Sequence, residues 1–303
     1  MIHVVDPTSH KRKGIIDNLG DEIIKESINN FLTVNDLQFD WISYKENPNG
    51  IIILGGANIL STNPWSNDSC WNPIKSLIKS NNIFLLGVGW WQYQNLNKST
   101  RFAYRKTFKN NIQSVRDSYT QNKLKSCGVK NIVNTSCPTT WNLPKNFKAS
   151  NAIILTLTDY NKSYIQDKFL IELLLKKYDK CFFWPQGIGD LDYLHELGFV
   201  SDFEILDRSL KSYDECLETY SATMVGTRLH AGIRALQKGN QALILSVDNR
   251  ATEINKDINI PVISRFDLAQ IEIALSREIM IIPKTIEVNL YKDLFLKNIK
   301  EII

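Results

Sequence analysis

An apolar strand pattern runs into a Gly-Thr turn and then into an apolar helix pattern in the segment 225–235, which reads VGTRLHAGIRA. Such a turn leaves backbone N–H groups at the helix N-terminus without intrahelical partners, and the helix dipole adds positive potential there. An anion is therefore the expected ligand of Gly226 and Thr227. Arg228 adds a planar cation that suits phosphate or carboxylate, and His230 adds a titratable proton donor. The segment predicts acid chemistry on an anionic substrate.

Short apolar runs alternate with helical patterns along the whole chain, whose 303 residues exceed the usual size of one domain. Strands separated by helices form parallel sheets covered on both faces. The expected strands are residues 2–5, 39–43, 51–54, 83–86, 112–115, 132–133, 152–156, 181–184, 203–206, 223–225, 242–245 and 262–263, with helices at 119–127, 164–178, 213–220, 229–237 and 286–303. The pattern predicts an α/β protein with two Rossmann-like parallel-sheet domains that face a cleft.

Pro138 and Pro144 lie in a polar stretch with few periodic apolar positions, which predicts a domain linker at about residues 138–151. The expected domains are an N-terminal one at 1–140, which would hold the acceptor side, and a C-terminal one at 150–284, which would hold the donor side, followed by a helix at 285–303. The Lys residues of that helix are mixed with Glu and Asp, so we expect it to pack on the protein rather than on a membrane.

The balance of 36 basic and 32 acidic residues gives a net charge of only +4, which does not favour a nucleic-acid partner. The five cysteines are scattered, odd in number and without a C-x-x-C pair, which favours reduced thiols and argues against a disulfide scaffold or a zinc site. They are Cys70, Cys127, Cys137, Cys181 and Cys216. No signal-peptide pattern and no membrane-spanning run is seen, so we expect a cytoplasmic protein.

Two expected strands of the first half end in glycine turns, one at Gly55 and Gly56 and the other at Gly87 and Gly89. Open parallel sheets bind ligands at such strand ends. Tight turns also need glycine for purely conformational reasons, so the turns are equally consistent with a structural role.

Two charged residues of the first half are candidates for the same site. Asp21 precedes a helical pattern, so it is expected to cap that helix, and its carboxylate is also a candidate for the space between the domains. Arg116 either holds an anion or pairs with Asp117 or Asp21, and the sequence favours neither.

Two expected loops of the second half, residues 184–190 and 247–253, are rich in hydrogen-bonding groups beside apolar residues. Their composition suits a sugar ring as well as it suits an ordinary exposed loop. The candidate ligands are Gln186 in the first loop and Asp248, Asn249 and Arg250 in the second.

Five segments together resemble the polysaccharide pyruvyl transferase family in their order along residues 14–265. They are Asp17-Asn18-Leu19-Gly20-Asp21, Leu54-Gly55-Gly56, Ser114-Val115-Arg116-Asp117, Ser136-Cys137-Pro138 and Gly226-Thr227-Arg228-Leu229-His230-Ala231. The resemblance implies a fold similar to the two-domain GT-B glycosyltransferases. It also implies transfer of a pyruvyl group from phosphoenolpyruvate to a sugar, with release of phosphate and formation of a pyruvate ketal, without a metal or other cofactor.

The resemblance and the chemistry assign roles to the candidates. His230 is expected to protonate the donor as a general acid, and Asp21 to accept a hydroxyl proton or orient the acceptor. The expected donor ligands are Arg228, Arg116, Thr227 and Gly226, and the expected acceptor or loop residues are Asn18, Gly55, Gly56, Gln186, Asp248, Asn249 and Arg250. Many family members have Asp where this chain has Cys137, and a thiol cannot replace a carboxylate as base.

The implied acceptor is a sugar of a bacterial capsule, exopolysaccharide or cell-wall glycan, or its lipid-linked precursor, which would place the protein in the cytoplasm or at the inner membrane face. Two other functions fit the same architecture: a glycosyltransferase that uses a nucleotide sugar, and a carbohydrate-binding relative without turnover. His230 also has a structural alternative as a core histidine at a helix start. The residues leave open whether the chain forms a homodimer.

Overall fold

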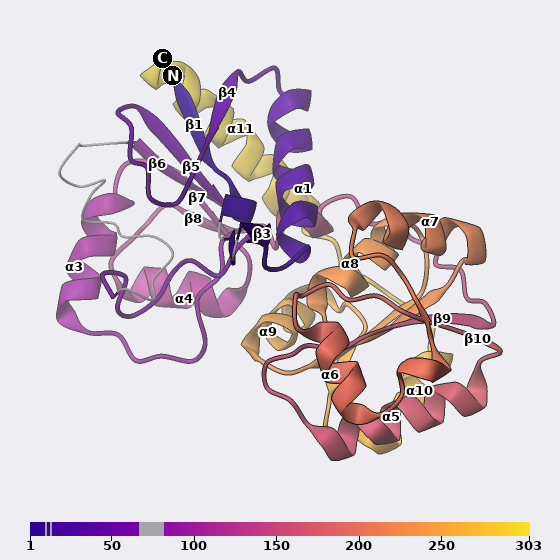
Figure 1. Ribbon diagram of the computed structural model, residues 1–303. Coiled ribbons are helices and arrows are strands. Elements are labelled where there is room, and N and C mark those ends of the chain that lie inside the picture. The colour runs from indigo at the N-terminus through magenta and orange to yellow at the C-terminus, as the bar shows by residue number, and fades with distance from the viewer. Residues whose placement is uncertain (10, 13, 67–81) are drawn as a thin grey trace. The chain divides into compact units, whose positions relative to one another are not determined.

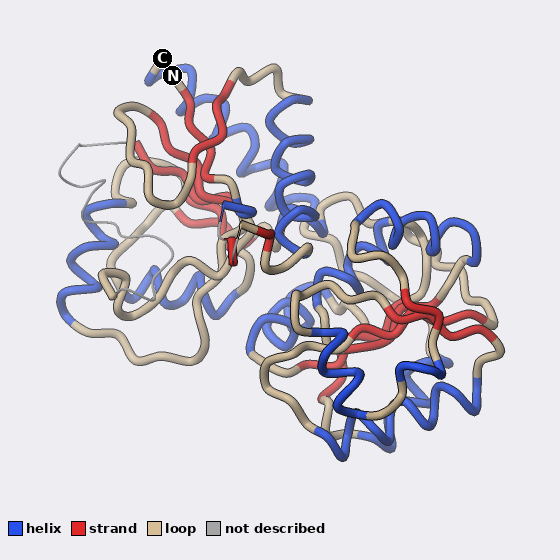
Figure 2. The backbone as a smooth tube through the Cα atoms, viewed as in Figure 1, coloured by secondary structure: helices blue, strands red, loops and turns tan. Residues whose placement is uncertain are grey.

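The computed structural model describes residues 1–9, 11–12, 14–66 and 82–303 (Figures 1 and 2). It divides into two compact units, which are described separately below. Unit 1 comprises Met1–Ile16, Ile24–Trp141 and Pro283–Ile303, and unit 2 comprises Asp17–Ile23 and Asn142–Ile282. The sequence-based boundaries grouped residues 17–23 with the first domain and left the final helix apart. Cys70 lies outside the described residues.

Unit 1 contains a parallel sheet in the order β4-β1-β5-β6 and a separate parallel pair, β7-β8. The strands are β1 (Ile2–Val5), β4 (Phe39–Ile42), β5 (Ile51–Gly55), β6 (Asn82–Leu86), β7 (Gln113–Val115) and β8 (Ile132–Asn134). The short strands β2 (Lys11–Arg12) and β3 (Ile15–Ile16) form an antiparallel pair.

Helices cover both faces of this sheet because alternate strand residues point to opposite sides. Among the described residues of unit 1, the helices are α1 (Gly20–Val34), whose first residues belong to unit 2, α3 (Lys98–Thr107), α4 (Ser118–Ser126) and α11 (Thr285–Ile302), with 3-10 turns η1 (Pro7–Ser9) and η2 (Pro138–Thr140). Ile53 lies in a core with α1 and α11, whereas its neighbour Ile52 lies in a core with α3 and α4. Figure 1 shows α1 and α11 on the same side of the strands.

Unit 2 is built on one parallel sheet in the order β11-β10-β9-β12-β13-β14. The strands are β9 (Ala152–Thr156), β10 (Lys180–Phe183), β11 (Glu204–Ile205), β12 (Thr223–Gly226), β13 (Ala242–Ser246) and β14 (Val262–Ser264). In chain order this is 3-2-1-4-5-6, the strand order of dinucleotide-binding folds. Its topological switch point lies between β9 and β12, where such sheets bind ligands beyond the carboxyl ends of the strands.

Six α-helices cover this sheet, three on each face. One core contains residues of α5 (Tyr164–Lys177), α6 (Asp190–Leu197) and α10 (Ile271–Ser276), and the other contains residues of α7 (Leu210–Tyr220), α8 (Leu229–Gln237) and α9 (Asn249–Ile258). The remaining short turns are η3 (Val200–Asp202) and η4 (Leu268–Gln270). The predicted α/β class with two parallel sheets is confirmed.

The predicted helix 229–237 agrees with α8 at both ends, because its apolar positions recur with a helical period and Arg228 precedes it in an extended conformation. The predicted loop 247–253 is wrong: α9 begins at Asn249, with the Asp248 side chain accepting a hydrogen bond at its N-terminus. Helix α3 was not predicted, because most of its residues are polar and it buries only Thr100, Ala103 and Tyr104, so few apolar positions mark its period.

Gly226 is the position of unit 2 at which the backbone requires glycine most strictly. Its φ is +148°, and a Cβ there would overlap the carbonyl oxygen of Thr156 on the neighbouring strand β9. The strand can therefore turn into Thr227 and Arg228 only with glycine at this position.

We expect Gly226→Ala to lower the free energy of unfolding by about 3 kcal/mol or more, because the backbone strain and the overlap add. Gly198→Ala is the matched control: φ there is +86°, but no atom lies within 4 Å of the added Cβ, so we expect a loss of only about 1–2 kcal/mol. Urea denaturation of both variants measures the difference. Equal losses would contradict the close packing of β12 on β9.

Candidate active site

Arg228 and the charged and aromatic residues near it follow the carboxyl ends of the central strands of unit 2. Asp159 and Tyr160 follow β9, Asp190 follows β10, and Arg228 follows β12. Asp248 follows β13. They therefore lie at the edge of the sheet where its topology predicts a ligand site.

Arg228 is held by two carboxylates. Its Nε donates to Asp190 Oδ2 at 2.9 Å, and its Nη2 donates to Asp190 Oδ1 and, at 3.1 Å, to Asp159 Oδ1. The guanidinium also lies 5.4 Å from the Tyr160 ring centre and is 5% exposed. Burial alone would lower the pKa of Arg228, but the Asp190 carboxylate holds that pKa above its ordinary value. Arg228 is thus a cation whose position is fixed by two carboxylates.

Asp190 is fully buried at the start of α6 and organises the turn that precedes this helix. Its carboxylate accepts hydrogen bonds from the backbone N–H groups of Gly187, at 2.7 Å, and Asp159, at 3.2 Å, in addition to Arg228. A Cβ at Gly187 would overlap the guanidinium of Arg228, so this glycine permits the close approach of the cation. One carboxylate therefore joins the ends of β9, β10 and β12.

Arg250 forms a second cationic group near Tyr160. Its Nε donates to Asp248 Oδ2 at 2.8 Å, its Nη2 bonds to the Tyr160 hydroxyl, and its Cζ lies 5.7 Å from the Tyr160 ring centre. Burial would lower the pKa of Arg250, but Tyr160 and Asp248 raise it above its ordinary value. Tyr160 therefore contacts Arg228 and Arg250, which the sequence placed in separate motifs.

The segment Asp17–Ile23 is part of unit 2 and bonds to the loop after β10. Asn18 pairs with Gly187 as an antiparallel bridge, and Gln186 Nε2 donates to Asn18 Oδ1 at 2.6 Å. The structure thus brings together two predicted acceptor residues, Asn18 and Gln186.

The same segment lies beside His230. A Cβ at Gly20 would lie 3.1 Å from the His230 Cβ, so the first turn of α1 contacts the first turn of α8. His230 is 6% exposed. Thr227, two residues before α8, accepts a hydrogen bond from Thr158 N through Oγ1 at 2.8 Å, which fixes the turn.

Asp21 is not the cap of the helix it was expected to precede. Helix α1 begins at Gly20, which places Asp21 within the first turn, and Asn18 Oδ1 accepts the hydrogen bond from Gly20 N at 3.1 Å. A carboxylate in a first helical turn is still favourable, because it faces the positive end of the dipole. Asp21 therefore lies on the turn that contacts His230.

Arg116 belongs to unit 1, where it is 2% exposed and paired. Its Nε donates to Asp117 Oδ2 at 3.1 Å and its Nη1 to Asn58 Oδ1 at 2.6 Å. A Cβ at Gly89 would overlap the guanidinium, so Arg116 lies against the glycine turn after β6. Of the two readings left open by the sequence, the structure shows the pairing with Asp117.

The other glycine turn of unit 1 serves helix packing. Added Cβ atoms at Gly55 and Gly56 would overlap Ile28 and Ile24 of α1, so these glycines let the helix lie against the end of β5. Cys137 is buried beside them, with Sγ 3.9 Å from the Gly56 carbonyl oxygen, and burial raises the pKa of its thiol. Cys137 is therefore a neutral packing residue.

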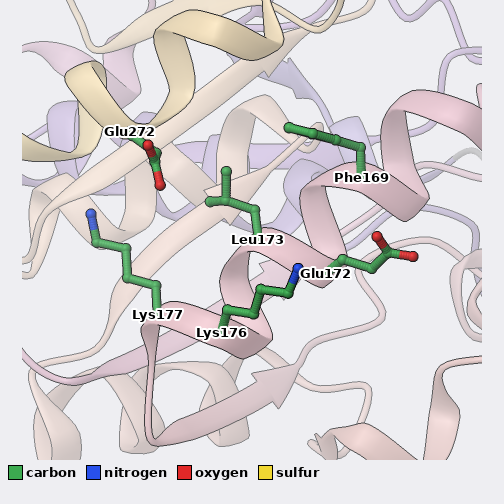
Figure 3. Close-up of a pocket in the computed structure, with 6 residues that line it drawn as sticks. All are labelled: Phe169, Glu172, Leu173, Lys176, Lys177 and Glu272. Atoms are coloured by element: carbon green, nitrogen blue, oxygen red, sulfur yellow. The ribbon is translucent and has the colours of Figure 1, made fainter.

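Two further structural features bear on the location of the site. A surface pocket of about 450 Å³, shown in Figure 3, is lined by Phe169, Glu172, Leu173, Lys176 and Lys177 of α5 and Glu272 of α10. It contains none of the predicted site residues, so it is separate from the candidate site.

Across the described part of the chain, no three His, Cys, Asp or Glu side chains group in a way that could hold a metal ion.

Comparison with known proteins decides the family. The family model of polysaccharide pyruvyl transferases matches residues 18–249. The chain belongs to this family. It is therefore a transferase of polysaccharide biosynthesis that acts on a saccharide acceptor. A search among curated proteins gave no match. Within residues 1–9, 11–12, 14–66 and 82–303, every helix is too short or too polar to span a bilayer.

Solved structures resemble this pyruvyl transferase in fold. The structure of S. aureus MnaA with UDP matches at a TM-score of 0.50 and 10% identity, over 97% of this chain and 90% of that chain. A functionally uncharacterized protein from Klebsiella pneumoniae subsp. pneumoniae gives 0.48 at 14% identity, over 84% and 87% of the two chains. The match to MnaA is a likeness of fold alone.

Sequence reasoning missed the partners of Arg228. Asp159 lies shortly after the predicted strand 152–156, and the rule that ligands bind at such strand ends was a signal that could have found it. Asp190 lies in the loop 184–190, which was a candidate for sugar binding, but Asp190 itself was given no role. Their separations from Arg228 are 69 and 38 residues, so no local pattern connects them.

We expect Asp190→Asn to lower the free energy of unfolding by about 3 kcal/mol, because it leaves the buried charge of Arg228 without its main partner. Asp192→Asn on the exposed side of α6 is the matched control and should change this free energy by at most about 0.5 kcal/mol. Urea denaturation compares the two. A pair of variants with the same midpoint would show that the Asp190–Arg228 bond does not hold the turn together.

Proposed function

We propose that this protein transfers the pyruvyl group of phosphoenolpyruvate to two hydroxyls of a saccharide, with His230 as the general acid. The observation that supports the proposal is that a fixed guanidinium, Arg228, and a histidine in the first turn of α8, His230, lie together at the switch point of unit 2. Phosphoenolpyruvate combines a phosphate and a carboxylate on a small enol, and cations with helix N–H groups suit both anions.

The reaction would begin with proton transfer from His230 to the methylene carbon of the donor. The neighbouring carbon then becomes electrophilic, and a sugar hydroxyl attacks it and loses its proton. Inorganic phosphate leaves this carbon, and the second hydroxyl attacks in its place, gives its proton to the departing phosphate and closes the ketal. An imidazolium can donate near neutral pH, which makes histidine suitable for the first step.

Asp21 is our candidate for the group that accepts the hydroxyl proton. It lies in the first helical turn of α1, next to Gly20, whose backbone approaches the Cβ of His230. Asn18, on the same segment, accepts a hydrogen bond from Gln186 in the loop after β10. These two residues are the proposed acceptor ligands. The proposal uses no metal and no further cofactor.

Arg228 would bind the donor through the guanidinium nitrogen that its carboxylate partners do not use. Asp190 and Asp159 accept hydrogen bonds from Nε and Nη2. The proposed donor ligand is Nη1, whose direction is fixed by the plane of the guanidinium. Asp190 and Asp159 hold that plane and act as positioning residues. Arg116, in unit 1, is retained as a proposed second donor ligand on the strength of the family resemblance alone.

We expect His230→Gln to lower the rate of phosphate release from phosphoenolpyruvate, in the presence of a saccharide acceptor, by about 100-fold or more, because the proton donor is lost. His195→Gln is the matched control: this histidine is exposed on α6 of the same unit, and its variant should keep the wild-type rate. Turnover of the His230 variant close to that of the control would remove His230 from the mechanism.

We expect Arg228→Lys to raise the KM for phosphoenolpyruvate roughly tenfold or more, because an ammonium cannot bond to both carboxylates and also present a fixed donor to the substrate. Arg277→Lys, at an exposed position, should leave the KM unchanged. Steady-state kinetics gives both values, and thermal denaturation verifies that each variant is folded at the assay temperature. An unchanged donor KM in the folded Arg228 variant would place donor binding elsewhere.

A further inference from the structure

Positive charge is concentrated in one segment of unit 1. Residues 82–134 contain nine Lys and Arg residues and a single acidic residue, Asp117. Because the whole chain has 36 basic and 32 acidic residues, the remainder of the sequence carries more acidic than basic side chains. The net charge of the whole protein is therefore small although residues 82–134 are strongly cationic.

The single carboxylate of this segment does not offset that charge at the surface. Asp117 is 1% exposed, accepts hydrogen bonds from Arg116 and from the backbone of Thr120, and caps α4. The Lys and Arg side chains of the segment other than Arg116 are exposed or half-buried. No exposed acidic side chain lies between residues 82 and 134.

The outer face of α3 combines cations with an aromatic ring. Lys98, Phe102, Arg105 and Lys106 recur at helical spacing and are exposed, whereas Tyr104 lies on the buried side. Phe102 is 56% exposed, and the Lys106 Nζ lies 5.8 Å from its ring centre. An exposed phenylalanine among cations contributes nothing to the core of unit 1.

Helix α4 and the chain before α3 continue this surface, and Figure 1 shows α3 and α4 together in the magenta part of the chain. Arg101 of α3 donates to the Ser126 carbonyl oxygen at the end of α4 at 2.7 Å. Tyr93, 59% exposed, packs edge-on against Tyr119 at 5.1 Å between ring centres. Trp91, 49% exposed, lies two residues before it. We call the surface formed by Trp91, Tyr93, Arg101, Phe102, Arg105 and Lys106 the basic aromatic face.

We propose that the basic aromatic face binds the anionic surface of a lipid bilayer. Clustered Lys and Arg side chains are attracted to anionic headgroups, and each adds to the affinity. Half-exposed Trp, Tyr and Phe rings favour the interface between headgroups and acyl chains. The basic aromatic face includes neither the proposed catalytic residues nor Arg116, which is buried.

A bilayer accounts for both components of this face. A nucleic acid or another polyanion would satisfy the cations, whereas a bilayer interface offers anionic headgroups to the cations of α3 and an apolar boundary to the exposed rings. The family acts on saccharides and not on nucleic acids, which also favours the lipid surface over a polynucleotide.

Co-sedimentation with vesicles tests this proposal on the full chain. The wild-type protein should bind vesicles of phosphatidylcholine mixed with phosphatidylglycerol, should not bind vesicles of phosphatidylcholine alone, and should dissociate as the salt concentration rises. The double variant Arg105→Glu, Lys106→Glu should bind the anionic vesicles at least about tenfold more weakly.

The matched control is Lys176→Glu, Lys177→Glu, which makes the same change of net charge at two exposed residues of α5 in unit 2. It should retain binding within about threefold, since only the general charge has changed. Phe102→Ser should weaken binding as well, and this loss should persist at higher salt because it removes an apolar contact.

Three results would overturn the proposal. They are equal binding to vesicles with and without phosphatidylglycerol, equal losses for the α3 and α5 double variants, and displacement of the protein from vesicles by a DNA duplex that the α3 variant no longer binds. The last result would make the face a polyanion site. Thermal denaturation of every variant excludes unfolding as the cause of lost binding.

Discussion

The buried contact of Arg228 with Asp190 and Asp159 is the interaction on which the candidate site depends. It connects the ends of β9, β10 and β12 at the switch point of the unit 2 sheet, and it fixes the plane of a guanidinium that is almost fully buried. A buried charge is tolerated only with such partners. The arrangement therefore fixes the position of one cation at the carboxyl ends of these strands.

Much of the fold could be predicted from the sequence, because the strands and helices of unit 2 follow local patterns of apolar residues. Its buried strands are short apolar runs between helical patterns, and one predicted helix, 229–237, agrees with α8 at both ends. The turn before it was recognised from Gly226, whose backbone excludes any side chain. The ordered motifs around this turn also identified the family, which the match over residues 18–249 confirms.

The side-chain partners could not be predicted, because they come from distant parts of the chain. Nothing in the local sequence pairs Arg228 with Asp190, and nothing places the N-terminal segment around Gly20 beside His230 in unit 2. The pairing of Arg116 could be foreseen, because its partner Asp117 is the next residue in the sequence.

The most direct measurement of the central claim is mass spectrometry of the saccharide product formed from phosphoenolpyruvate in D₂O, with a panel of acceptors. The account predicts a product heavier by one pyruvyl group, with one deuterium in its methyl group and one phosphate released, because His230 exchanges with solvent and protonates the methylene carbon. A pyruvyl product without deuterium, or glycosyl transfer from a UDP-sugar with no reaction of phosphoenolpyruvate, would contradict it.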